Sequence, residues 1–204
     1  MSQYFFKNYI NFEKIKYILA ILIVNGKFLM NSISSHKSSN LSGNLIVPGD
    51  KSILHRSLII GSLVNGRIEI NNLLESEDVI ATANALRILG VQINKLNNKW
   101  EVFGSGIGNF YGSNYTLNMG NSGTGARLLM GLIAGSDIEA TFIGDESLSK
   151  RPMKRITSPL KKTGATIGNQ TNNLPIKIKG NKIVLPIEYE SSVPSAQVKS
   201  SILL

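Results

Sequence analysis

Several predicted helix starts in the sequence carry residues that could bind an anion. At the first, Lys51 and Ser52 follow a Pro-Gly-Asp turn, and Arg56 lies one turn later on a similar face. Glycine lets a backbone approach a ligand closely, and the free amides of a helix start favour negative charge. These cations and this hydroxyl suit a phosphate or a carboxylate, although the same short string also occurs at ordinary capped helices.

The second helix start supplies an amide side chain, a bare backbone and a hydroxyl from Asn121, Gly123 and Thr124. Arg127 follows them, 71 residues after Arg56. Taken alone, this is a weak glycine-rich turn. We consider it a candidate anion site because it resembles the first helix start.

Two further segments complete the set. Residues 150–155 hold four cations among six residues, including Arg151. Such a run is usually a solvated face, but its place beside the other helix starts in the repeat favours an anion site. Ser195, Ala196 and Gln197 open another predicted helix with a hydroxyl and an amide, which suit a polyhydroxylated ring.

The remaining titratable residues give weaker signals. His55 has no carboxylate at a telling spacing, so we expect a packed or surface histidine rather than a base. Glu75, Glu77 and Asp78 could bind a metal, but acids in a first helical turn commonly interact with the helix dipole. We assign them no chemistry.

The elements that must position these residues form a repeat. We expect a strand ending at 45–47, a helix through about 63, a strand at 67–70, a helix at 79–89 and a hairpin of 91–94 with 99–103. The same order returns as a strand at 115–118, a helix from 120–124, a strand at 138–143, a helix at 147–162 and a hairpin near 172–173. A third helix starts at 195. This order predicts repeated βαβαββ units of an α/β protein packed around a shared core.

Composition limits the alternatives. The 204 residues are 42% hydrophobic, enough for one domain or part of a larger protein, and the absence of cysteine excludes disulfides and thiolate chemistry. The net charge of +9 favours anionic partners, but aromatic residues make only 7%, so a nucleic-acid binder ranks last. We interpret residues 1–40 as a leader or an upstream extension before a true start at Met30, although a plastid transit peptide would look similar.

The ordered motifs together resemble the 5-enolpyruvylshikimate-3-phosphate synthase family (3-phosphoshikimate 1-carboxyvinyltransferases). The resemblance runs from about residue 41 to 204 and rests on five segments: 47–52 with His55 and Arg56, 74–78, 120–124 with Arg127, 144–153, and 195–200. It implies two lobes of three α/β units each, an inside-out α/β barrel, with substrates between them. Residues 48–204 would form the first lobe, with two complete repeats and the start of a third, and 41–47 a strand that joins the second lobe.

By resemblance, the activity is transfer of the enolpyruvyl group of phosphoenolpyruvate to the 5-hydroxyl of shikimate 3-phosphate, with no cofactor or metal, by a cytoplasmic monomer. The expected shikimate 3-phosphate ligands are Lys51, Ser52, Arg56, Ser195, Ala196 and Gln197. Those for phosphoenolpyruvate are Lys51, Asn121, Gly123, Arg151 and Gln197. The family's proton-transfer residues lie in its later part, so we expect this chain alone to be inactive. The alternatives are a non-catalytic phosphate-binding module and the related UDP-N-acetylglucosamine enolpyruvyl transferase, in which a cysteine commonly serves.

Overall fold

The computed structural model describes residues 23–24, 27–28, 42–45, 47–97, 99–168, 172–192 and 194–204. The chain divides into two units, Met1–Val47 and Pro48–Leu204. In the first unit, β1 (Ile23–Val24) and β2 (Lys27–Phe28) pair as antiparallel strands. Most of the expected leader, including Met30, lies outside the described residues. Within the described part, every helix is too short or too polar to cross a bilayer.

From its first helix onward, the first repeat has the predicted order of elements. It contains α2 (Lys51–Leu63), β3 (Asn65–Asn71), α3 (Glu77–Ile88), β4 (Gln92–Leu96) and β5 (Lys99–Ser105). The strands form an antiparallel sheet in the order β3-β5-β4. Helix α2 begins where predicted because the Asp50 carboxylate accepts a hydrogen bond from the Ile53 amide, at 2.8 Å.

The second repeat begins with a parallel strand pair. Strand β6 (Tyr111–Asn118) runs parallel to β7 (Asp137–Ile143), and α4 (Gly123–Ala134) connects them. After α5 (Glu146–Ser149) and α6 (Lys154–Lys162), strands β8 (Thr166–Gly168) and β9 (Ile176–Lys179) complete a sheet in the order β6-β7-β9-β8. The predicted second hairpin is therefore confirmed.

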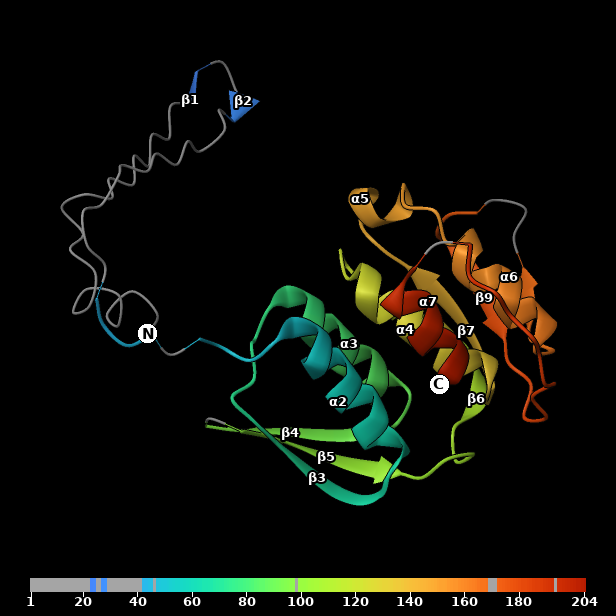
Figure 1. Cartoon of the computed structure of the whole chain (residues 1–204), viewed down its shortest axis with the longest axis horizontal. Coiled ribbons are helices and arrows are strands. Elements are labelled where there is room, and N and C mark those ends of the chain that lie inside the picture. The colour runs from blue at the N-terminus through green and yellow to red at the C-terminus, as the bar shows by residue number, and fades with distance from the viewer. Residues whose placement is uncertain are drawn as a thin grey trace. The chain divides into compact units, whose positions relative to one another are not determined.

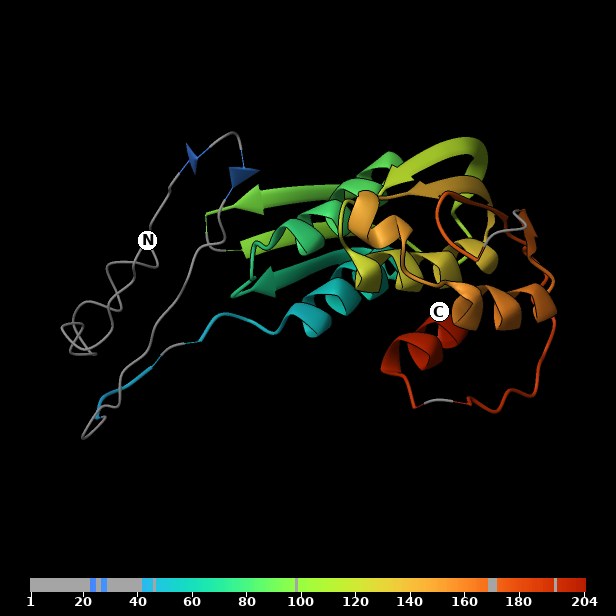
Figure 2. The same cartoon turned by 90° about the horizontal axis from the view of Figure 1, so that it is seen from above.

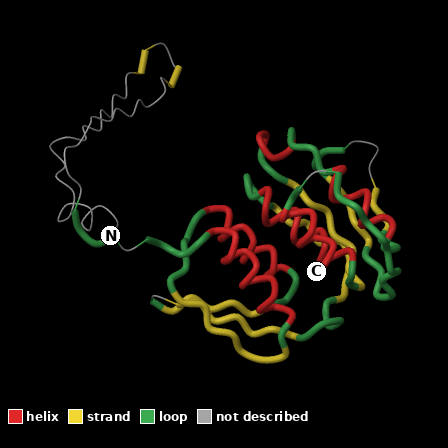
Figure 3. The backbone as a smooth tube through the Cα atoms, in the orientation of Figure 1, coloured by secondary structure: helices red, strands yellow, loops and turns green. Residues whose placement is uncertain are grey.

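The helices lie inside and the sheets outside. In Figure 1 and Figure 2, α2, α3, α4 and α7 (Ala196–Leu203) gather together, with the β3-β5-β4 sheet on one side and the β6-β7-β9-β8 sheet on another. The secondary-structure colouring in Figure 3 shows the same layering. Helix α4 contacts α2, α3, α6 and α7, so nearly all of its residues are buried. The predicted α/β fold with its helices at the core is confirmed.

Two glycines occupy matching places in the two repeats and allow the same close approach. A side chain at Gly104, in β5, would meet the carbonyl oxygens of Val64 and Gly61 at the end of α2, at 2.1 and 2.3 Å. A side chain at Gly180, just after β9, would meet the carbonyl oxygens of Ile133 and Ser136 at the end of α4, at 1.9 and 2.2 Å. Each repeat therefore needs a bare backbone where its last strand crosses its first helix.

The single helix predicted at 147–162 is wrong. The structure divides this segment into α5 and α6, separated by residues 150–153. Pro152 has no amide hydrogen and disfavours a helical conformation for Arg151. The Met153 amide donates instead to the carbonyl of Asn172, at 2.7 Å, which takes the chain out of a helical path.

The described residues just before α2 form no strand. Residues 42–45 and 47–50 have no strand conformation. The matching strand of the second repeat, β6, is held by its parallel neighbour β7, and a strand needs such a partner. The pairing of residues 41–47 with a second lobe stays a prediction.

Candidate anion-binding site

The start of α2 presents its cations on a partly open surface. The Lys51 ammonium lies 2.8 Å from an oxygen of Asp78, in the first turn of α3, and 49% of its side chain remains exposed. Ser52 is exposed, and its carbonyl accepts a hydrogen bond from Arg56 Nη1 at 3.0 Å. Within the described residues, Arg56 forms no ion pair with a carboxylate.

Two guanidinium groups meet at the start of α4. A Cβ atom on Gly123 would lie 2.9 Å from Nη1 of Arg127 and 3.0 Å from Nη1 of Arg151. Arg127 is only 6% exposed, and burial, followed by the positive charges of Arg155 and Arg151, lowers the pKa of its guanidinium. In the described part of the chain, no carboxylate forms an ion pair with these three arginines. An anion bound beside Gly123 would relieve their mutual repulsion.

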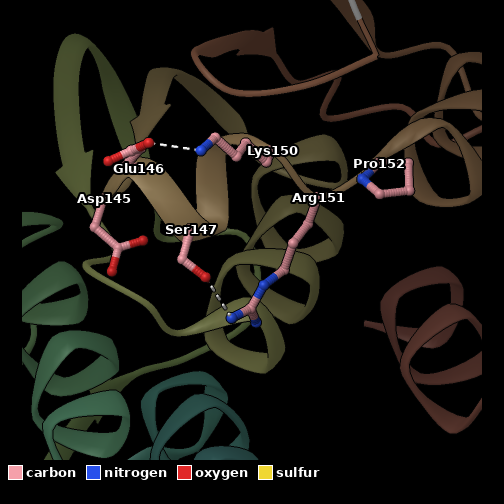
Figure 4. Close-up of a pocket in the computed structure, with 6 residues that line it drawn as sticks. All are labelled: Asp145, Glu146, Ser147, Lys150, Arg151 and Pro152. Carbon is pink, nitrogen blue, oxygen red and sulfur yellow. Dashed lines mark hydrogen bonds and ion pairs between the residues drawn. The ribbon is translucent and has the colours of Figure 1, made fainter. Parts of the chain in front are cut away.

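Asn121 connects the start of α4 to the segment that carries Arg151. Its Nδ2 donates to Asp145 Oδ2 at 2.8 Å, and its Oδ1 accepts from Nη2 of Arg151. The same Nη2 lies 3.2 Å from the Ser147 hydroxyl oxygen, as Figure 4 shows. These contacts fix the Arg151 side chain at the helix start. Asp145, which caps α5 through the Leu148 amide, had no predicted role.

Helix α7 makes hydrogen bonds with both α4 and α2. Arg127 Nη1 donates to Gln197 Oε1 at 3.0 Å, and Gln197 Nε2 donates to the Thr124 hydroxyl at 2.9 Å. Farther along α7, the Ser200 hydroxyl accepts from Arg56 Nη2 at 2.8 Å. Arg56 of α2 and Arg127 of α4 therefore each donate a hydrogen bond to α7, at Ser200 and Gln197 respectively.

The other two predicted residues of α7 make fewer contacts. The Ser195 hydroxyl accepts from the Val198 amide at 3.4 Å and so caps the helix. Ala196 is exposed and contributes only its backbone to a site. The predicted use of Ser195 and Ala196 for neutral hydrogen bonds to a ligand stays a prediction.

His55 is a packed histidine, one of the two outcomes expected. It is fully buried in α2, and its Nδ1 lies 2.8 Å from the Thr82 hydroxyl oxygen of α3. Burial lowers its pKa from 6.5 to about 4, with Lys51 and Arg56 acting in the same direction and Asp78 opposing them. The imidazole is therefore neutral at pH 7 and holds two helices together.

A surface pocket lies beside Arg151. It is lined by Asp145, Glu146, Ser147, Lys150, Arg151 and Pro152 (Figure 4). Of the predicted site residues only Arg151 lines this pocket, and the Lys150 ammonium forms an ion pair with Glu146 at 2.5 Å. The candidate site is therefore the surface made by the helix starts, which extends beyond this pocket.

The fold and this surface define a class of protein: an α/β lobe whose helix starts assemble cations and neutral donors for small anionic ligands. A family model described as EPSP synthase (3-phosphoshikimate 1-carboxyvinyltransferase) matches residues 35–204. The chain belongs to this family. The resemblance predicted from its motifs is confirmed.

Relatives with the name 3-phosphoshikimate 1-carboxyvinyltransferase occur in several bacteria. That of Parvibaculum lavamentivorans is 49% identical over 176 residues, which cover 85% of this chain and 39% of the relative. That of Rhodospirillum rubrum is 49% identical over 178 residues, covering 84% of this chain and 40% of the relative. The chain thus spans about two fifths of the length of these relatives. Their shared name does not favour the UDP-N-acetylglucosamine alternative.

A solved structure supports the same assignment. The EPSP synthase from Acinetobacter baumannii superimposes with a TM-score of 0.74 at 40% sequence identity. The match covers 79% of this chain and 37% of that chain. The described fold is therefore similar to about a third of a known EPSP synthase.

Proposed function

We propose that this chain is the substrate-binding lobe of an enzyme that transfers the enolpyruvyl group of phosphoenolpyruvate to shikimate 3-phosphate. In this reaction the 5-hydroxyl of shikimate 3-phosphate adds to the enolpyruvyl carbon. Phosphate then leaves from the tetrahedral intermediate. The product enters the biosynthesis of aromatic amino acids.

The meeting of two guanidinium groups at Gly123 carries this proposal. Phosphoenolpyruvate has a phosphate and a carboxylate, and Arg127, Arg151 and Arg155 form a cluster without carboxylate ion pairs in the described residues. In our proposal Arg151, Asn121 and the Gly123 backbone hold phosphoenolpyruvate. Planar guanidinium groups bind such oxyanions through paired hydrogen bonds.

The same surface offers a second set of donors for shikimate 3-phosphate. Arg56 and the exposed Ser52 would hold shikimate 3-phosphate, and the α7 start at Ser195, Ala196 and Gln197 would line the same site. Lys51 would contact both substrates, and Gln197 would also approach phosphoenolpyruvate. The contacts that already connect these helix starts would hold the donors in place before charge develops on the reacting atoms.

The proposed enzyme needs the rest of the relatives' length for turnover. Its proton-transfer groups would come from the part of the relatives that this chain does not span, and the substrates would close between two lobes. In this proposal the enzyme acts as a cytoplasmic monomer and uses no cofactor. The chain by itself would bind substrates weakly.

A chimera tests the proposed function. Residues 35–204 of this chain would replace the matching segment of the Rhodospirillum rubrum relative, and phosphate release from shikimate 3-phosphate plus phosphoenolpyruvate would be measured. We expect turnover. A folded chimera that releases no phosphate contradicts the proposal and favours the alternative of a phosphate-binding module.

Substitution of Lys51 tests the site within that chimera. Lys51→Met should abolish phosphate release while the chimera stays folded, because it removes an exposed charge and little packing. Lys161→Met, the same substitution on an exposed residue of α6, is the matched control and should leave activity unchanged. Equal activity in the two variants would refute the role proposed for Lys51.

A further inference from the structure

Asp78 stands out as a carboxylate at the edge of a surface built for anions. Its Oδ2 lies 2.8 Å from the Lys51 ammonium, and 25% of its side chain is exposed. A carboxylate beside a proposed binding site for two polyanions is electrostatically unfavourable for ligand binding. A carboxylate in this position calls for a compensating role.

The position of Asp78 relative to Lys51 is fixed by a buried contact one turn further along α3. The Thr82 hydroxyl lies 2.8 Å from His55 Nδ1 of α2 and 3.3 Å from the Asp78 carbonyl oxygen. Both His55 and Thr82 are fully buried. A Cβ atom on Gly125 of α4 would lie only 2.2 Å from the same Thr82 oxygen, so α4 closes over this contact. The packing of α2, α3 and α4 around Thr82 therefore fixes the first turn of α3, and with it Asp78, beside Lys51.

The chemistry of an ammonium group explains what this arrangement does. A lysine ammonium has three N–H donors on a flexible stem and no acceptor. Asp78 accepts one of them, which leaves two, and the exposed half of the side chain keeps these two open to ligands. Two free donors are the number needed by a lysine that contacts two substrates at once.

We infer that Asp78 is a positioning residue that orients the Lys51 ammonium, so that its two remaining N–H donors face the two substrates. This inference rests on the proposed function. It assigns Asp78 no direct contact with either substrate. The effect acts through Lys51 and depends on the His55–Thr82 contact for its geometry.

A simpler role for Asp78 is interaction with the dipole of α3, since it lies in the first turn. Glu77 lies in the same turn, is exposed and forms no ion pair within the described residues. Glu77→Gln is therefore the matched control, because it removes a first-turn charge and leaves Lys51 untouched. Asp78→Asn keeps the shape of the side chain and removes the charge.

The two roles predict different kinetics in the active chimera. If Asp78 orients Lys51, Asp78→Asn should lower kcat about tenfold, because a misplaced group loses transition-state stabilisation. KM for either substrate should stay equal or fall, because a negative charge has left an anion site. Asp78→Glu should recover part of kcat, and Glu77→Gln should behave like the parent. Asp78→Ser, which keeps a polar first turn, should repeat the loss if the Asn variant folds poorly.

The outcomes separate the inference from the function it rests on. A chimera without turnover refutes the proposed function and this inference together. An active chimera in which Asp78→Asn matches Glu77→Gln in kcat overturns the inference alone. So does a variant whose KM rises while kcat stays at the parent value, since that pattern marks uniform substrate binding.

Discussion

Replacement of the buried histidine of α2 should change how the stability of the protein depends on pH. His55 is fully buried against Thr82, and its pKa is lowered from 6.5 to about 4. His55→Asn keeps a polar group near the position of Nδ1 and removes the titration. At pH 7 the variant should be less stable than the parent because it leaves a cavity.

The sign and size of the effect follow from proton linkage. Between pH 6.5 and about 4 the unfolded chain binds a proton on His55 that the folded chain does not bind. The parent therefore loses stability as the pH falls through this window, and loses no more from this group below about pH 4. At roughly 1.4 kcal/mol per pKa unit, the full loss is about 3 kcal/mol.

Urea unfolding of the 204-residue chain at several pH values between 7 and 4 measures this effect. Trp100, the single tryptophan, is 4% exposed and reports unfolding by fluorescence. Lys99 lowers the pKa of Glu69, and Lys95 lowers the pKa of Glu75. Their protonation in acid destabilises the parent and the His55→Asn variant equally, so it cancels in the comparison. The stability gap between parent and variant should narrow by about 3 kcal/mol as the pH falls from 6.5 to 4. Curves of stability against pH that stay parallel for the parent and His55→Asn would refute the argument.

Two other substitutions test the packing and capping of the helices. Gly131→Ala should lower the unfolding free energy by about 2 kcal/mol, because its Cβ would lie 2.0 Å from the Ser201 carbonyl oxygen of α7. Gly135→Ala, whose nearest neighbour is 3.6 Å away, should have little effect, and equal losses in the two variants would contradict the close approach of α4 and α7. Asp50→Ala should cost about 1 kcal/mol because it removes the cap of α2, as measured by thermal unfolding. Ser76→Ala should be nearly neutral because the Ser76 hydroxyl makes no hydrogen bond with the described residues. The cap argument fails if Asp50→Ala and Ser76→Ala cost the same.

Hydrophobic periodicity, helix-cap residues and turn residues predicted most of the helices and strands, because these signals are local in sequence. Asp50 and Gly90, for example, stand where α2 begins and just after α3 ends, and Gly90 has the positive φ of 93° that favours glycine. The break between α5 and α6 is not predicted by the local pattern, because a proline can also stand in the first turn of a helix. A contact with Asn172, distant in sequence, decides the path of the chain there.

The candidate site was predictable in its residue types but not in its connections. Arg56 and Arg127 recur at matching places, which indicated two equivalent helix starts. The contacts from Arg127 to Gln197 and from Lys51 to Asp78 join residues 70 and 27 positions apart. No local pattern specifies such pairs. The sequence alone therefore indicates only a dipole interaction for Asp78, and the packing of α3 on α2 places it beside Lys51.

The central claim is that the helix starts of this chain bind shikimate 3-phosphate and phosphoenolpyruvate. Its most direct test is a titration of the 204-residue chain with shikimate 3-phosphate, followed by NMR of the backbone amides, with inorganic phosphate as the reference ligand. We predict shifts concentrated at residues 50–56 and 195–200 that are larger than those caused by phosphate at the same concentration. Shifts confined to the lysine-containing elements α6 and β9, or identical for the two ligands, would contradict the claim.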